Sequence, residues 1–101
     1  MKTKIEFLNN EYNIELFLTR YGYKNRIAIQ AIDTSDGEIF GTLTTNIEGE
    51  IEENEFFVKD WSENSWVPGV LNSFPEYFED TGKRFESGFV QVPVWLLKKT
   101  F

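Results

Sequence analysis

The sequence predicts a single α+β domain over residues 1–101, with a twisted antiparallel sheet of five or six strands and one short helix packed on it. Three observations predict this class. Apolar and polar residues alternate along several runs of the first half, an Asp-Gly step separates two β-rich runs, and apolar residues at helical spacing occur in one short stretch. With 41% hydrophobic and 17% aromatic residues, a chain of this length can bury a core of its own.

The first two strands are expected to form a β-hairpin. Residues 4–8 place Ile5 and Phe7 on one face and charged residues on the other, as in a half-buried strand. Asn9 and Asn10 then offer a turn, and residues 12–18 repeat the alternation, although Phe17 falls on the polar face.

A second pair of strands follows a loop at residues 21–25. The runs 26–32 and 38–47 are rich in β-branched residues and flank Asp36-Gly37, which is a strong local hairpin signal. The second run is predicted to place these residues on one face: Ile39, Gly41, Leu43, Thr45 and Ile47. Together with the first hairpin, this gives four strands in meander order.

The helix is predicted in the second half. Residues 48–55 show no buried periodicity and indicate a loop or a frayed strand edge, whereas residues 55–61 resemble a short strand with Phe56 and Val58 facing the core. Ser62 to Asn64 offer N-cap side chains, and Trp66, Val70 and Phe74 follow at i, i+4 and i+8. A helix over about residues 65–74 is therefore expected.

Pro75 is expected to end this helix, and residues 75–88 to connect it to a last strand at residues 89–97. Pro93 removes one main-chain donor from that strand, which indicates a sheet edge or a bulge. The first residues carry charges and reach Asn9 before any apolar core of a signal peptide, and no run is long enough to span a membrane. We therefore expect a cytoplasmic protein with no membrane partner.

The residue types limit the chemistry. Without cysteine or histidine, the chain lacks thiolate metal ligands and the general bases most common at neutral pH. Paired carboxylates could serve glycoside hydrolysis, but that reaction needs a sugar-binding cleft, which a domain of this size seldom builds. We predict no enzyme, no cofactor and no metal: residues 33–38 read as a hairpin turn more readily than a calcium loop, and Glu48, Glu50 and Glu52 as solvated charges.

Charge is concentrated in one stretch. Residues 48–63 carry seven acidic residues and one lysine, an excess of six negative charges in a chain whose net charge is −7. This argues against direct nucleic-acid binding and favours a basic partner. The predicted partner-binding residues are Glu48, Glu50, Glu52, Glu53, Glu55, Asp60, Trp61 and Glu63.

Two interpretations of this acidic stretch stay open. In an extended chain, alternate carboxylates lie roughly 6.6 Å apart, which is similar to the spacing of neighbouring phosphates on one DNA strand and would suit a DNA mimic. Alternatively, the glutamates only prevent aggregation of a β-rich domain. Trp61 could contribute to an interface or to the core, whereas Trp66 is expected in the core.

Several short motifs resemble a known family. Residues 43–47 (LTTNI), residues 57–64 (FVKDWSEN), Thr81-Gly82, residues 87–89 (SGF) and residues 92–94 (VPV) are similar to a family of small domains of unknown function on bacterial conjugative elements, plasmids and phages. The resemblance covers about residues 27–97, although Trp61 and Glu63 stand between Asp60 and Asn64, where the family pattern is only approximate.

The resemblance implies a functional context. Small acidic domains on mobile elements often inhibit host defence, and anti-CRISPR proteins do so by occupying a basic nucleic-acid channel of the effector. It thus implies a protein or ribonucleoprotein partner in a bacterial host cell. The alternative is a non-enzymatic accessory domain that forms a homodimer or binds a small ligand, through a sheet edge near Pro93 or a pocket between helix and sheet.

Overall fold

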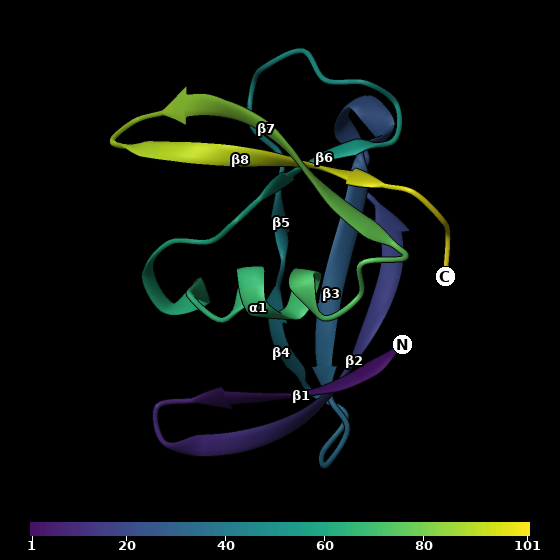
Figure 1. Cartoon of the computed structure of the whole chain (residues 1–101), viewed down its shortest axis with the longest axis vertical. Helices are drawn as coiled ribbons and strands as arrows, with labels where there is room; N and C mark the ends of the chain where they lie inside the picture. The colour runs from purple at the N-terminus through teal and green to yellow at the C-terminus, as the bar shows by residue number, and fades with distance from the viewer.

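The chain folds into two antiparallel sheets of four strands each, with one short helix beside them (Figure 1). The computed structural model describes residues 1–101. Sheet A contains, in spatial order, β1 (Lys2–Phe7), β2 (Asn10–Arg20), β3 (Ile27–Asp33) and β4 (Ile39–Thr42). Sheet B contains β5 (Thr44–Thr45), β6 (Glu55–Val58), β8 (Val90–Leu97) and β7 (Phe78–Ser87). The mixed class was correctly predicted, whereas the single sheet of five or six strands is wrong.

Sheet A confirms the predicted meander of four strands. The first turn lies one residue earlier than expected, at Leu8 and Asn9, which have φ values of 51° and 64°, and Phe7 pairs with Asn10 across it. The β3–β4 turn contains Gly37 at a φ of 75°, in the left-handed region that glycine adopts readily. Asn9 and Gly37 thus occupy left-handed turn positions that suit them, whereas Leu8 adopts such a position without being a typical turn residue.

The predicted strand at residues 38–47 divides between the two sheets at Leu43. The Leu43 N–H donates to Ile29 O in sheet A at 2.9 Å, while the Leu43 carbonyl accepts the Lys59 N–H, next to β6, at 2.9 Å. Beyond this point the Ile29 N–H donates to Thr44 Oγ1 at 3.2 Å, so a side chain replaces the departing strand. One residue thus links the two sheets.

The predicted common face of residues 39–47 is wrong at its first residue. A bulge shifts the β3–β4 register, because Ala31 pairs with Gly41 but Ile32 pairs with Ile39. Phe40 has no partner in this register and packs against the Trp66 ring at 5.0 Å, whereas Ile39 is 60% exposed. At this end of β4 the bulge therefore turns Phe40 toward the core and Ile39 toward solvent.

The second half departs more from expectation. Residues 75–88 were predicted as a connection, but Phe78–Ser87 forms β7, which pairs with β8. Six of its ten residues are exposed and five are charged, so pairing with β8, rather than burial, defines this strand. Pro93 is buried in β8, which lies inside sheet B, so the predicted edge is wrong; a register shift between Asp80 and Arg84 confirms the bulge.

The helix α1 (Val67–Asn72) is shorter than predicted. Ser62 to Asn64 form a 3₁₀ turn and supply no side-chain cap, so the predicted N-cap is wrong. The Asn64 side chain instead donates to Thr42 O at 2.8 Å and to Lys59 O at 3.3 Å, which ties this turn to the junction of the sheets. No helix of the chain is long and apolar enough to cross a bilayer.

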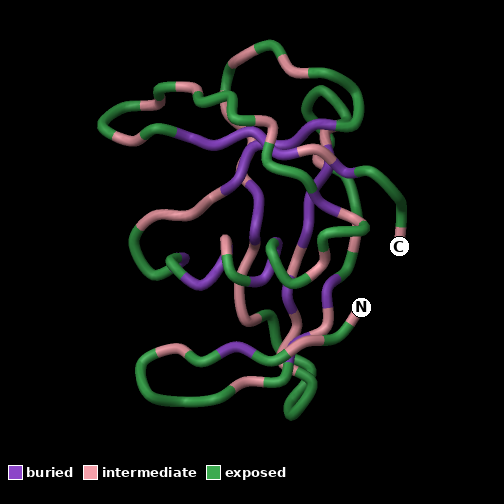
Figure 2. The backbone as a smooth tube through the Cα atoms, in the orientation of Figure 1, coloured by how far each residue is buried: buried purple, intermediate pink, exposed green.

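Most of the buried apolar residues form two clusters. The larger one fills the space between the sheets and α1, and Figure 2 shows its backbone as the buried middle of the molecule. As predicted, Phe56, Val58, Trp66 and Val70 belong to it. The smaller one, here called the outer cluster, contains Phe57, Val92 and Val94, with these half-buried residues against it: Ile47, Ile51, Trp61, Phe85 and Val90.

Candidate functional site

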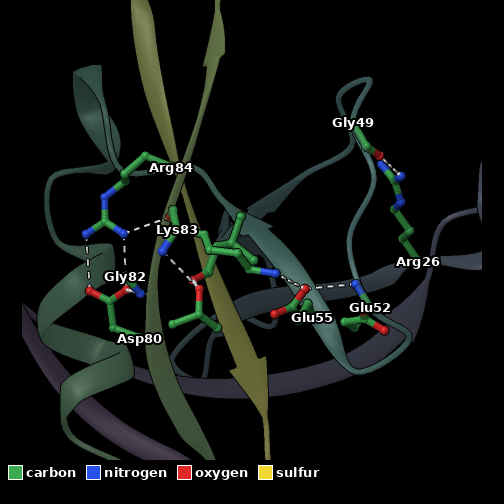
Figure 3. A network of polar contacts seen from close by, with 10 residues as sticks. Arg26, Gly49, Glu52, Glu55, Asp80, Gly82, Lys83 and Arg84 are labelled. Carbon is green, nitrogen blue, oxygen red and sulfur yellow. Dashed lines mark hydrogen bonds and ion pairs between the residues drawn. The ribbon is translucent and has the colours of Figure 1, made fainter.

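The acidic loop is defined as residues 46–54, which connect β5 to β6. Arg26, at the start of β3, holds it: its guanidinium donates to Ile47 O at 2.7 Å and to Gly49 O, and lies over the Phe57 ring at 5.2 Å. Asn46 Nδ2 also donates to Tyr23 O at 3.0 Å. Hydrogen bonds from side chains to main-chain carbonyls thus fix the first half of the loop, and Figure 3 shows the one from Arg26 to Gly49.

Apolar contacts with the outer cluster also hold this loop in place. Ile47 and Ile51 pack against the outer cluster, and Gly49 lies against the rings of Phe57 and Phe85. Residues 48–55 were expected to show no periodicity that buries a side chain; Ile51 is half-buried here, and Glu55 is buried. Two isoleucines four residues apart were a weak signal, because this spacing puts them on one face of a helix and equally on one face of a strand, and so predicts neither.

Glu55 lies inside, contrary to the prediction of an exposed partner-binding residue. Its side chain is 8% exposed, and Oε1 accepts hydrogen bonds from Lys83 Nζ at 2.7 Å and from the Glu52 N–H at 2.8 Å (Figure 3). Burial opposes ionisation of this carboxyl, but the hydrogen bonds outweigh that effect and lower its pKa below the ordinary value. Glu55 therefore anchors the end of the acidic loop to β7.

Glu48 and Glu50 are exposed and share a cation. Their side chains are 80% and 97% exposed, and their carboxylates lie 4.0 Å and 3.9 Å from Lys24 Nζ. Glu48 Oε1 also accepts a hydrogen bond from the Tyr23 hydroxyl at 3.0 Å. Both glutamates thus point to the same side, toward the 3₁₀ turn at Tyr23–Asn25.

Glu52 and Glu53 are exposed, and no lysine or arginine nitrogen lies within 4.0 Å of their carboxylates. The loop is not an extended row of carboxylates, because it contains no strand and bends at Glu48 and Gly49. The predicted phosphate-like spacing along one strand is therefore wrong. Instead, four exposed carboxylates surround a bend, and two of them lack a cationic partner.

Asp60, Trp61 and Glu63 follow β6 and lie outside the acidic loop. Trp61 is half-buried against the outer cluster, so much of its ring is part of the scaffold. Glu63 is exposed, and a hydrogen bond from the Ser62 hydroxyl at 2.6 Å lowers its pKa. Asp60 is half-buried and is near enough to Arg84 to raise the pKa of that guanidinium slightly, after the larger effect of Asp80.

A basic wall opposite the acidic loop was not predicted. Arg20, Lys24 and Arg26 line one side of a cleft of about 270 Å³, and Glu50, Glu52 and Glu53 line the other. The signal for it was present, because three of the ten basic residues fall within residues 20–26. Its position opposite the acidic loop depends on the fold.

The acidic side chains are not gathered around a common point: no three of them meet in a metal-binding arrangement. The hairpin turn at residues 33–38 is formed by Asp33, which accepts hydrogen bonds from the Ser35 N–H and hydroxyl, and these lower its pKa. The geometry of the acidic loop is suited to charged contacts with another molecule.

Comparisons with known proteins do not assign this surface. No family model matches the chain, and no curated protein or solved structure matches it. The resemblance to a family on mobile elements therefore remains a prediction from the short motifs alone. What the acidic loop does has to be argued from its own contacts and charges.

Proposed function

We propose that this protein is a non-enzymatic protein-binding domain whose acidic loop docks on a basic surface of its partner. In the form that the motif resemblance implies, the partner is a bacterial defence effector, and the domain acts as an anti-CRISPR protein by covering the nucleic-acid-binding surface. The observation that carries the proposal is a rigidly held loop that presents four exposed carboxylates: Glu48, Glu50, Glu52 and Glu53.

The order of the loop supports a role in binding. Arg26 binds its carbonyl groups, Ile51 packs beneath it and Glu55 closes its end, so the loop conformation depends on three separate contacts. A loop that is ordered before binding loses little conformational entropy when it meets a partner.

The charge distribution supports a basic partner. The acidic loop faces its own basic wall on one side, and Lys24 already pairs with Glu48 and Glu50. Glu52 and Glu53 have no such partner, so they are the carboxylates with most to gain from an external cation. Contacts of this kind accelerate association and weaken as salt screens the charges.

The test is inhibition of purified CRISPR effector complexes, assembled with guide RNA, in a DNA-binding assay. The wild-type protein is expected to reduce DNA binding by at least one complex, with an inhibition constant that rises with salt concentration. A variant with Lys in place of Glu48, Glu50, Glu52 and Glu53 should lose at least tenfold in affinity for that complex.

A matched control reverses four other exposed acidic residues, on the β3–β4 turn and near the start of β7: Asp36, Glu38, Glu76 and Glu79. It changes the net charge equally and should retain inhibition, apart from a small general effect of charge. Equal losses in both variants would show that net charge, not this loop, governs binding. If no complex is bound or inhibited, the anti-CRISPR form of the proposal is wrong.

A further inference from the structure

The edge strand β1 carries main-chain groups that no neighbouring strand uses. The Leu16 N–H donates to Met1 O, and Phe7 pairs with Asn10 across the turn, so odd-numbered residues of β1 face β2 in the ladder. In an antiparallel pair the residues between them direct their N–H and C=O groups to the other side. In β1 these are Lys2, Lys4 and Glu6, and β1 is the first strand of sheet A.

A groove lies along this free edge. Its volume is about 310 Å³, near the lower end of the roughly 300–1,000 Å³ typical of ligand sites. Residues 4–6 of β1 line one side, and α1 with its flanking residues Ser65, Trp66 and Ser73 lines the other. Ile5, Trp66 and Val70 form an apolar floor, and each of them is buried in the main core.

The far wall of the groove limits what can enter it. Because α1 borders the groove opposite β1, a strand that is already paired on its other side would meet the helix. A lone extended segment therefore suits this space better than a second copy joined through its own β1–β2 hairpin. Gly69 leaves room for that segment, because a Cβ atom built there meets no atom within 4 Å.

We infer that this groove binds an extended peptide segment of a partner protein as an added strand on β1. Main-chain hydrogen bonds to Lys4 and Glu6 would align it, and side chains would select it. A residue opposite Ile5 faces the apolar floor, while its neighbours lie on the solvent face beside Lys4 and Glu6. In the antiparallel direction, the segment that fits reads basic, apolar, acidic.

The inference is independent of the acidic loop. The groove lies beside β1 and α1, whereas the acidic loop lies beyond β5 and contacts the turn at residues 23–25. Charged side chains at Lys2, Lys4 and Glu6 also protect this edge from indiscriminate pairing. They admit a segment of complementary charge and disfavour other strands.

The test measures binding of blocked, dye-labelled heptapeptides by fluorescence anisotropy and by amide chemical shifts. The probe Thr-Ser-Lys-Val-Glu-Ser-Thr is expected to bind and to shift the amides of β1 and α1. A peptide with Lys and Glu exchanged should bind at least threefold more weakly, and one with Asp in place of Val at least tenfold more weakly. No saturable binding of any of these peptides would overturn the inference.

Two variants locate the site on the protein. Gly69→Leu places an apolar side chain at the wall of the groove, where an added Cβ meets no atom within 4 Å, and should weaken binding at least tenfold. Lys4→Pro removes an outward N–H while leaving the β1–β2 hydrogen bonds in place, and should have a similar effect. Amide spectra report whether each variant is folded, so a folded Gly69→Leu protein that binds the probe with unchanged affinity contradicts the inference even if Lys4→Pro unfolds.

Gly22→Leu is the matched control. Gly22 has an ordinary φ of −64°, a Cβ atom there also meets nothing within 4 Å, and it lies outside the groove lining. It should leave peptide affinity within twofold of wild type. Shifted amides confined to the acidic loop would place peptide binding there instead, and would contradict this inference without affecting the proposed function.

Discussion

The two sheets of this protein are covered differently. Sheet A has one face on the main core and the other in solvent, so Ile14 and Leu16 are buried while Asn13 and Phe17 on the opposite face are exposed. Sheet B is covered on both faces, because all four residues of β6 are buried and Phe57 points into the outer cluster on the side away from Phe56.

The second cover of sheet B is the acidic loop itself. Ile47 and Ile51 lie on the outer cluster while the glutamates between and after them face solvent, so one short segment both closes an apolar face and presents charge. This difference between the sheets explains why the loop is ordered. A charged surface segment is held in place here by apolar contacts beneath it, and its stability can be separated from its charge.

The largest expected effect on stability comes from a substitution in the main core, and it distinguishes this core from the outer cluster. Phe56→Ala removes a fully buried ring from the core shared by both sheets and should destabilise the protein by about 3–5 kcal/mol. Phe57→Ala should cost less and loosen the acidic loop first, because its ring serves the outer cluster and Arg26. Urea denaturation and hydrogen exchange of residues 46–54 would show this, and equal global losses with no early loop exchange would contradict it.

A smaller effect is expected at Gly49. Its φ of 149° lies in a region that other residues rarely adopt, and an added Cβ would come within 2.8 Å of the Phe85 ring. Gly49→Ala should therefore cost about 1–3 kcal/mol by thermal or urea unfolding. Gly22→Ala, which has an ordinary φ and open space, should change stability by less than about 0.5 kcal/mol.

The different covers also explain which elements could be predicted from the sequence. Apolar and polar residues alternate along sheet A because one of its faces is in solvent, so Ile5 and Ile14 could be assigned to the core from the sequence. The Asp36-Gly37 step likewise identified the second turn. The bulge that turns Phe40 inward, and the division of one strand at Leu43, depend on packing against Trp66 and on a shared hydrogen bond. No local pattern encodes either of them.

Sheet B was predicted in part: residues 55–61 and 89–97 were expected as strands and form β6 and β8. β7 was missed, because Phe78 is its one buried residue and it has no hydrophobic period to detect. The candidate site could also be predicted only in part. Glu48, Glu50, Glu52 and Glu53 are exposed as composition suggests, but the burial of Glu55 depends on Lys83, which lies 28 residues further along the chain.

Arg26→Lys should test how strongly the loop depends on its main-chain contacts. Lysine keeps the charge but cannot reach the carbonyl groups of Ile47 and Gly49 together, or stack as a plane over Phe57. A loss of about 1–2 kcal/mol is expected, with faster hydrogen exchange confined to residues 46–54. Unchanged exchange there would show that the apolar contacts alone order the loop.

Glu55 should make the loop sensitive to acid. Because its pKa is lowered in the folded protein, its ionised form contributes stability that is present above the unfolded pKa, about 4.3, and is lost as pH falls through the lower folded value. Glu55→Gln should flatten the dependence of stability on pH in this acidic range. A variant that follows the wild-type curve below pH 5 would contradict this role.

The smallest effect is expected at the exposed glutamates, where it is most informative. Replacing Glu48, Glu50, Glu52 or Glu53 with Gln should change the free energy of unfolding by less than about 0.5 kcal/mol each, since exposed ion pairs such as those with Lys24 contribute little. The same changes should weaken partner binding if the acidic loop is the contact surface. A stability loss above about 1 kcal/mol for Glu52→Gln or Glu53→Gln would instead indicate that these carboxylates support the fold, as Glu55 does.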